Sequence, residues 1–182
     1  MFRISKDTPA HYLTCVTKDR LPVFRTAVLK DLVCGALDEA RRSAKFLLFA
    51  YVVMPDHLHA ITGSTLKPSK VLQYINGITG RRVIGYLKDN GYGTSLAKLR
   101  HQDRGRKHVY SLWDHHANAK ALTHEDVFIQ KVNYLHRNPV RAGLVEHAED
   151  YRWSSIRCWL RKPREDEPLL VDLDQIVWRK RD

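Results

Sequence analysis

The sequence predicts an α+β fold, in which an antiparallel sheet carries helices on one face and the chain ends in a C-terminal tail. Two observations support this: short apolar runs rich in β-branched and aromatic residues, and longer segments whose apolar residues recur at helical spacing. They alternate as strand, helix, strand, strand, helix, strand, helix. The first six elements match the split β-α-β order of a ferredoxin-like sheet. A length of 182 residues suits one such domain, expected over residues 1–160, with the tail over 161–182.

The first half of the chain contributes three strands and one helix to this pattern. Residues 11–17 are rich in β-branched and aromatic side chains and predict the first strand. Residues 26–44 have apolar side chains at helical spacing, with Thr26 as a suitable N-cap. The apolar run 46–54 stops at a Pro-Asp turn signal, and a second run follows over 57–62. We therefore expect a strand, a tight turn and a strand.

The second half continues with a helix over residues 69–90, which contains three glycines that each weaken it by roughly 1 kcal/mol relative to alanine. Residues 90–108 show little regular pattern and are strongly basic, which favours contact with phosphate. Residues 109–113 predict a fourth strand. Residues 123–138 predict a last helix, which Pro139 ends because proline disfavours helical geometry at the residue before it.

Composition indicates the kind of partner. Lysine and arginine number 31 against 20 acidic residues, for a net charge of +11, which points to a polyanion such as nucleic acid. The longest apolar run, residues 46–54, is much shorter than the ~20 residues that cross a bilayer, so no membrane is expected. The three cysteines are widely spaced and indicate a reducing cytoplasm. DNA binding would associate the protein with the nucleoid there.

His57 and His59 are candidate metal ligands. Residues two apart on a strand share a face, so the two imidazoles point the same way and Leu58 points into the core. Two imidazoles held side by side form half of a metal site. The alternative is a pair of histidines that merely alternate on a half-exposed strand. A divalent cation held there would lower the barrier to attack on a phosphodiester.

The helix over residues 123–138 contains a candidate nucleophile. At 100° per residue its apolar positions Phe128, Val132 and Leu135 cluster on one face and should pack on the sheet. Tyr134 lies one turn before Asn138. A tyrosine phenol can attack phosphorus, and an asparagine amide oxygen can be a third metal ligand. On spacing alone the alternative stays open that Tyr134 packs at the core edge and Asn138 caps the helix.

Two segments resemble a known family. Residues 53–59, Val-Met-Pro-Asp-His-Leu-His, resemble the His-hydrophobe-His (HUH) signature of single-tyrosine transposases. Residues 134–145, Tyr-Leu-His-Arg-Asn-Pro-Val-Arg-Ala-Gly-Leu-Val, and the later Trp153-Ser-Ser155 resemble the hallmark of REP-associated tyrosine transposases. The motifs occur in the family's order and spacing between residues 11 and 159. The acidic patch in the tail matches no motif of the family.

The resemblance implies a ferredoxin-like HUH endonuclease that acts on single-stranded or hairpin DNA. It implies metal-dependent nicking and strand transfer through a 5′-phosphotyrosine, with transposase activity on hairpin-forming repeats. Carried over, Tyr134 is the nucleophile, His57 and His59 are metal ligands, and Asn138 is the third ligand. The cation would be Mg²⁺ or Mn²⁺, and the resemblance favours a monomer over a homodimer.

Basic residues are candidates for the DNA groove. Among them, Lys131 could also stabilise phenolate or phosphate charge. His115 or His116 could approach the metal, although packing or DNA contact suits these two histidines better. The alternative function is a non-catalytic hairpin-binding module or regulator; a zinc hydrolase of small substrates would leave the charge unexplained. Cleavage in the presence of Mn²⁺ separates enzyme from binder. The candidate DNA-binding residues are Arg81, Arg82, Arg100, Arg104, Arg106, Lys107 and Lys131.

Overall fold

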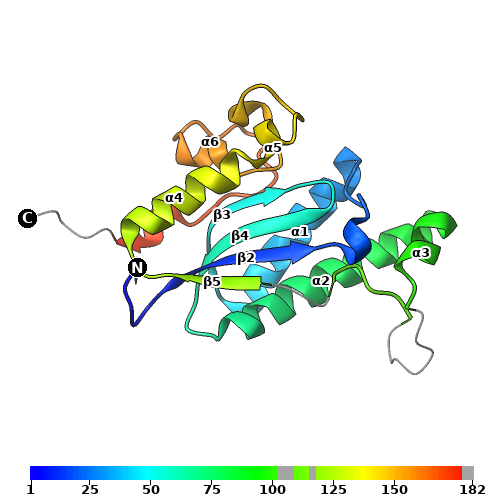
Figure 1. Cartoon of the computed structure of the whole chain (residues 1–182), viewed down its shortest axis with the longest axis horizontal. Coiled ribbons are helices and arrows are strands. Elements are labelled where there is room, and N and C mark those ends of the chain that lie inside the picture. The colour runs from blue at the N-terminus through cyan, green and yellow to red at the C-terminus, as the bar shows by residue number, and fades with distance from the viewer. Residues whose placement is uncertain (102–108, 115–117, 178–182) are drawn as a thin grey trace, which may run out of the picture.

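A four-stranded antiparallel sheet forms the middle layer of the computed structural model, which describes residues 1–101, 109–114 and 118–177. Its strands are β2 (Ala10–Val16), β3 (Leu47–Val53), β4 (His57–Gly63) and β5 (Asn118–Leu122), in the order β3-β4-β2-β5 (Figure 1). This is the predicted split β-α-β sheet. The predicted hairpin is confirmed, because β3 and β4 pair on either side of the Pro55-Asp56 turn.

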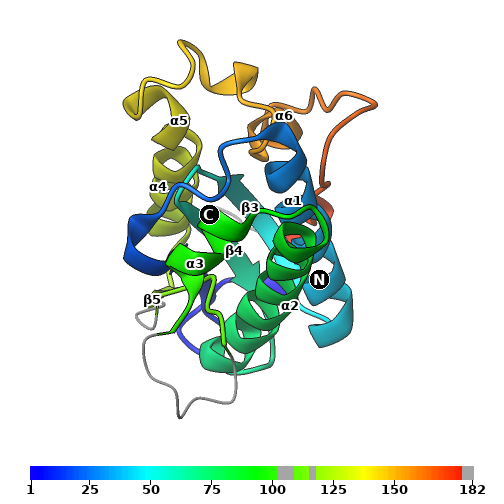
Figure 2. The ribbon, with the colours of Figure 1, turned by 90° about the vertical axis from the view of Figure 1, so that its right-hand side faces the viewer.

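Helices α1 (Ala27–Ala44) and α2 (Pro68–Asp89) cover one face of the sheet, as predicted (Figure 2). The Thr26 hydroxyl accepts a hydrogen bond from the Leu29 amide at 3.3 Å and caps α1, which confirms the expected N-cap. The core on this side combines apolar residues of both helices with inward-facing strand residues. Its fully buried members include Leu13, Leu37, Leu58, Ile75 and Leu87.

Helix α4 (Glu125–His136) packs on the opposite face of the sheet (Figure 2). Its buried residues Phe128, Val132 and Leu135 confirm the predicted apolar stripe. They meet a second core that includes Tyr12 of β2 and Ile61 of β4. Since side chains two apart on β4 share a face, the side that α4 covers is also the side of the two histidines.

The fourth strand differs from the prediction. Residues 109–113 form only isolated bridges, Thr17 with Trp113 and Arg100 with Tyr110, so the predicted strand there is wrong. The edge position is taken by β5, which pairs antiparallel with β2. Four of the five β5 residues are exposed, so its sequence has no apolar alternation from which a strand could be predicted. Trp113 instead serves the core: its Nε1 donates to the Thr79 hydroxyl at 2.8 Å.

Short helices complete the chain. Helix α3 (Gly93–Leu99) lies within the stretch that showed little regular pattern, and η1 (Lys18–Arg20) follows β2. After α4 come α5 (Asn138–Arg141), η2 (Ala148–Asp150) and α6 (Ile156–Trp159). In the described residues no helix is both long and apolar enough to cross a membrane.

The exposed edge of β3 is covered by the chain that follows α4. The Val53 amide donates to the Trp153 carbonyl at 2.9 Å, and the Ser155 amide donates to the Tyr51 carbonyl at 3.0 Å. These bonds satisfy backbone groups that an open edge strand would leave available to other chains. Residues 151–155 therefore act as a short, irregular extra strand beside β3.

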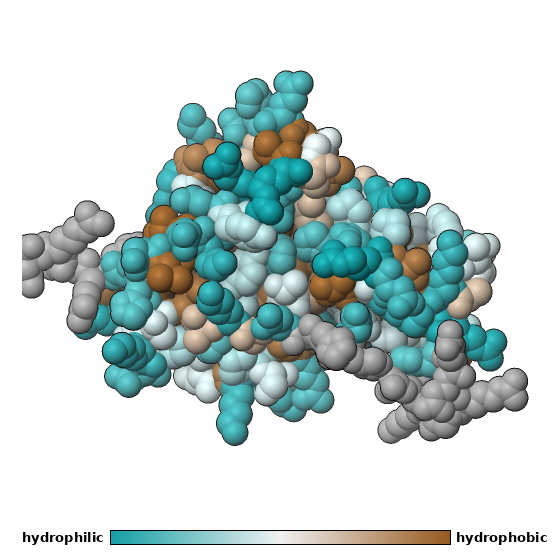
Figure 3. Space-filling view, in the orientation of Figure 1, coloured by the Kyte–Doolittle hydropathy of each residue, from teal (hydrophilic) through white to brown (hydrophobic). Residues whose placement is uncertain are grey.

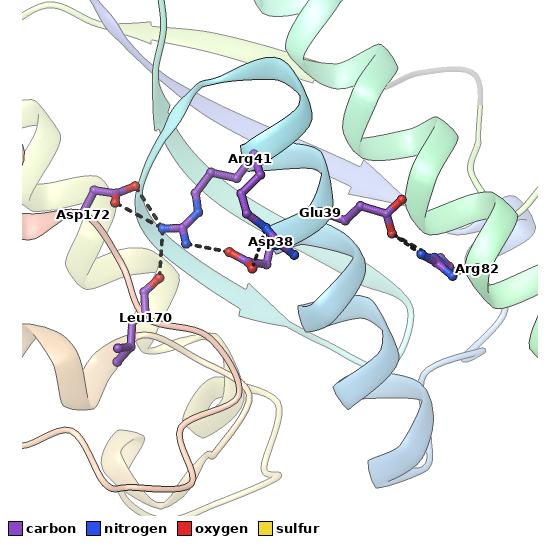
Figure 4. Close-up of polar contacts among 7 residues, drawn as sticks. Asp38, Glu39, Arg41, Arg82, Leu170 and Asp172 are labelled. Atoms are coloured by element: carbon purple, nitrogen blue, oxygen red, sulfur yellow. Dashed lines mark hydrogen bonds and ion pairs between the residues drawn. The ribbon is translucent and has the colours of Figure 1, made fainter.

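The described part of the tail folds back onto the domain. The Asp172 carboxylate accepts from the Leu48 amide at 2.8 Å and from the Arg41 guanidinium at 3.2 Å, and Arg41 also pairs with Asp38 at 2.6 Å (Figure 4). After η3 (Leu173–Gln175), β6 (Ile176–Val177) pairs in parallel with β1 (Phe2–Arg3). The tail therefore joins the start of β3 to the N-terminal strand.

Candidate active site

His57 and His59 lie side by side at the start of β4, with ring centroids 4.7 Å apart. Nδ1 of His57 donates to the Asp56 carboxylate at 2.6 Å. Nδ1 of His59 lies 3.0 Å from the hydroxyl of Thr14, its register partner on β2. With Nδ1 of each ring engaged, Nε2 is the nitrogen that each histidine can offer to a cation, and the partners set the ring orientations.

Burial keeps His59 in the form that binds metal. It lowers the pKa of His59 to about 3, and the neighbouring His57 contributes in the same direction. The ring is therefore neutral at physiological pH, with a lone pair available on one nitrogen. A protonated imidazole could not be a ligand, so this part of the site needs no proton release before a cation binds.

Asp56 is itself held from several sides. The Thr17 amide and hydroxyl donate to its backbone carbonyl at 2.9 and 2.8 Å, and Arg20 donates to its carboxylate at 3.1 Å. Burial alone would raise the pKa of Asp56, but the hydrogen bonds from His57 and Arg20 outweigh it and the pKa is lowered. Asp56 is therefore an ionised carboxylate that orients His57, the arrangement usual behind metal-binding histidines.

Helix α4 places Tyr134 on the same face of the sheet as the histidines. The Tyr134 ring lies 6.5 Å from the Tyr12 ring in an edge-on contact, and the Tyr12 ring lies 5.1 Å from His59. Tyr12 thus forms a bridge of contacts between the candidate nucleophile and the histidine pair. The Tyr134 side chain is 41% exposed, so a substrate can reach it.

Two cations flank Tyr134. The Lys131 ammonium lies 5.1 Å from its ring centroid, and the Arg141 guanidinium lies 4.5 Å from it. Lys131 was singled out from the sequence, whereas Arg141 was not. Arg141 lies beyond Pro139, which ends the predicted helix, so helical spacing gave no signal for it. Positive charge at this position attracts phosphate.

Asn138 caps the end of α4. Its Nδ2 donates to the carbonyls of Tyr134 and Leu135 at 3.0 and 3.1 Å, so the capping role considered from the sequence is present. Both partners are acceptors, which assigns Nδ2 to the helix side and directs Oδ1 away from these carbonyls. Capping and metal binding would use different atoms of the amide. The role of Asn138 as a third ligand stays a prediction.

Other motif residues fasten α4 to the sheet. Buried His136 places Nε2 2.8 Å from the Ser155 hydroxyl, and that oxygen accepts from the Tyr51 amide of β3 at 2.9 Å. Tyr151 donates its hydroxyl to the Val53 carbonyl at 2.8 Å. Burial lowers the pKa of His136 to about 3, so this ring is neutral. The segment after Tyr134 and the Trp-Ser-Ser segment therefore hold the tyrosine helix against β3.

The predicted DNA-binding residues that the structure describes do not gather in one place. Arg81 and Arg82 on α2 pair with Glu39 of α1 at 2.9 and 2.7 Å, across the sheet from the histidines (Figure 4 shows Arg82). Arg100 is exposed and lines a cavity of about 510 Å³ with Lys18 and other residues. The remaining candidates Arg104, Arg106 and Lys107, as well as His115 and His116, lie outside the described residues.

In the view of Figure 3 hydrophilic side chains predominate and the hydrophobic patches are separate.

Among the described residues, no three or more His, Cys, Asp or Glu side chains are grouped so that they could hold a metal.

A comparison with protein families finds a match for the region that contains both histidines. Residues 7–92 match the model of a family described as "Transposase IS200 like". This stretch runs from before β2 to the end of α2 and includes both histidines, whereas Tyr134 lies beyond it. Among curated proteins, no sequence match is found.

Two solved structures are similar to this chain. One is described as a REP-associated tyrosine transposase bound to a REP hairpin; it is 17% identical, with a TM-score of 0.61, over 93% of this chain and 89% of that one. A putative transposase from Deinococcus radiodurans is 20% identical, with a TM-score of 0.47, over 70% of this chain and 88% of that one. The first comparison shows a shared fold over most of the chain.

Proposed function

We propose that this protein is a transposase that nicks and rejoins single-stranded DNA through a 5′-phosphotyrosine on Tyr134, and that its substrate is hairpin-forming repeat DNA. The observation that supports this most directly is the run of ring contacts from Tyr134 through Tyr12 to His59. The likeness to a hairpin-bound transposase and the net charge of +11 support a DNA substrate.

His57 and His59 would hold Mg²⁺ or Mn²⁺ through Nε2, with Oδ1 of Asn138 as the third protein ligand. The donor set fits a cation, because Nδ1 of each ring is already engaged and His59 is neutral. When bound, the cation would polarise a phosphoryl oxygen and neutralise developing charge. Asp56 and Thr14 would keep the two rings in their orientation.

Tyr134 would carry the covalent chemistry. Its hydroxyl loses a proton, and the oxygen attacks phosphorus in line with the departing 3′ oxygen. The bond between phosphorus and that oxygen breaks, and the oxygen takes up a proton, leaving a free 3′-hydroxyl and a DNA 5′ end on Tyr134. Lys131 and Arg141, beside the ring, would stabilise negative charge on the phenol oxygen and the phosphate.

The intermediate would then be resolved by strand transfer. A 3′-hydroxyl of a second strand attacks the phosphotyrosine, a new phosphodiester forms, and Tyr134 departs as a phenolate. A phenol has a pKa of about 10, so it leaves far more readily than an alkoxide, and no external energy source is needed. The anchoring of α4 through His136 and Ser155 would keep the phenol in place during both steps.

The test is adduct formation on a labelled single-stranded oligonucleotide that folds as a hairpin with flanking unpaired bases. With Mn²⁺ or Mg²⁺, the wild type should yield a denaturant-resistant protein–DNA adduct and a shortened strand with a 3′-hydroxyl. Tyr134→Phe should bind the hairpin but form no adduct. Tyr92→Phe is the matched control, because Tyr92 is exposed and stacks on Tyr86 of α2, on the other side of the sheet.

Two outcomes would contradict the proposal. An adduct in Tyr134→Phe at the wild-type rate would show that another residue is the nucleophile. Tight hairpin binding by the wild type without cleavage in either cation would favour the alternative function, a non-catalytic binding module or regulator.

A further inference from the structure

Tyr12 occupies the space between the two halves of the candidate active site. Its ring contacts both His59 and Tyr134, and the Lys131 ammonium lies 5.6 Å from its ring centroid. It belongs to β2, two residues before Thr14, which contacts His59. Because positions two apart on a strand share a face, the Tyr12 and Thr14 side chains both point to the histidine side.

The Tyr12 hydroxyl has no hydrogen-bond partner among the described residues, although the side chain is only 8% exposed. A buried polar group without a partner is destabilising and rare in folded proteins. A phenylalanine would fill the same space without that cost. The unpaired hydroxyl therefore indicates a hydrogen-bond partner that the substrate supplies.

Other buried polar atoms without a partner in the described residues have a different setting. The Tyr51 hydroxyl lies on the α1 side of the sheet, where it interacts with the Cys34 thiol. Asn76 belongs to α2, and Arg152 and Glu167 lie in the segments after α5. Within this set only Tyr12 contacts the histidine pair.

Two cationic side chains, Lys131 and Arg141, lie beside the rings of Tyr12 and Tyr134, which suits a phosphate site. The Arg141 guanidinium lies 4.5 Å from the Tyr134 ring centroid, and the Tyr134 ring contacts the Tyr12 ring. A tyrosine hydroxyl is protonated at neutral pH, so the Tyr12 hydroxyl can donate a hydrogen bond. This donor lies between the histidine pair and Tyr134, where the proposed function would place the scissile phosphate.

We propose that Tyr12 is a further catalytic residue, whose hydroxyl donates a hydrogen bond to a non-bridging oxygen of the scissile phosphate between the histidine pair and Tyr134. This rests on the proposed function of the same site. The bond would strengthen as negative charge develops on that oxygen, complementing the cation on the other side of the phosphorus. No covalent bond to Tyr12 forms or breaks, and its proton stays on the phenol.

The test is Tyr12→Phe, which removes one oxygen atom and keeps the ring contacts. Adduct formation on the hairpin oligonucleotide should slow by about 10²-fold, the effect of losing one donor to a developing oxyanion. Hairpin binding should be unchanged, and the melting temperature should be unchanged or higher because the hydroxyl has no partner to lose. Tyr51→Phe is the matched control on the opposite face and should keep the wild-type rate.

A second readout separates catalysis from packing. Oligonucleotides with a single phosphorothioate at the scissile position exist as two diastereomers, and sulfur accepts hydrogen bonds poorly. One diastereomer should slow the wild type, and that slowing should largely disappear in Tyr12→Phe. A wild-type rate in Tyr12→Phe, or undiminished sulfur effects for both diastereomers, would overturn the role of Tyr12 while leaving the proposed function intact. Absence of any adduct in the wild type would overturn both.

Discussion

The two buried neutral histidines should make the free energy of unfolding fall steeply as the medium becomes acidic. His59 and His136 both have a pKa of about 3 in the folded protein, chiefly because burial disfavours the charged ring. In the unfolded chain a histidine has a pKa of about 6.5. Protons therefore bind the unfolded state first, so stability is complete above about pH 6.5 and is lost as the pH falls toward 3.

The magnitude follows from the difference in proton binding. At pH 5 an unfolded histidine has gained about 2 kcal/mol from protonation that the folded ring does not share, using 1.4 kcal/mol per pH unit. Two such rings should lower the free energy of unfolding by about 4 kcal/mol relative to pH 8. A domain of this size has a total stability of roughly 5–15 kcal/mol, so the loss is a large share of it.

The assay is urea unfolding at several pH values between 8 and 5, followed by tryptophan fluorescence and circular dichroism. His136→Gln isolates one ring, because an amide can still reach the Ser155 hydroxyl but does not titrate in this range. The variant should lose about 2 kcal/mol less than the wild type between pH 8 and pH 5. Equal losses in the two proteins would refute the reasoning, since His136 would then take up protons equally in both states.

Three further predictions concern single side chains. Asp56→Asn should weaken Mn²⁺ binding about 10- to 100-fold in calorimetry, because the carboxylate behind His57 is lost; an unchanged affinity would contradict the metal site. Phe128→Ala should lower the free energy of unfolding by about 3–5 kcal/mol in urea titrations, since this ring is fully buried between α4 and the sheet. Arg141→Met should slow adduct formation while Arg82→Met does not, because only Arg141 lies beside Tyr134; equal rates in the two variants would remove Arg141 from the site.

The sequence by itself determined the local elements and the histidine pair. Periodicity is a local property, so the two face-sharing imidazoles, the apolar stripe of α4 and the Thr26 cap could all be predicted from nearby residues. The order of the first elements also determined the sheet, because short connections allow few ways to pair the strands. The fourth strand was mistaken because β5 is mostly exposed and lacks an apolar pattern.

Tertiary structure alone decided what meets across the sheet. Helix α4 could have joined α1 and α2, and its apolar stripe would have looked the same in either place. The packing of α4 on the opposite face, beside Tyr12 and the histidines, depends on contacts between residues far apart in the chain. The same contacts leave Arg81 and Arg82 on the far side, where they pair with Glu39. Such long-range choices depend on how whole surfaces fit together, and no local spacing encodes that fit.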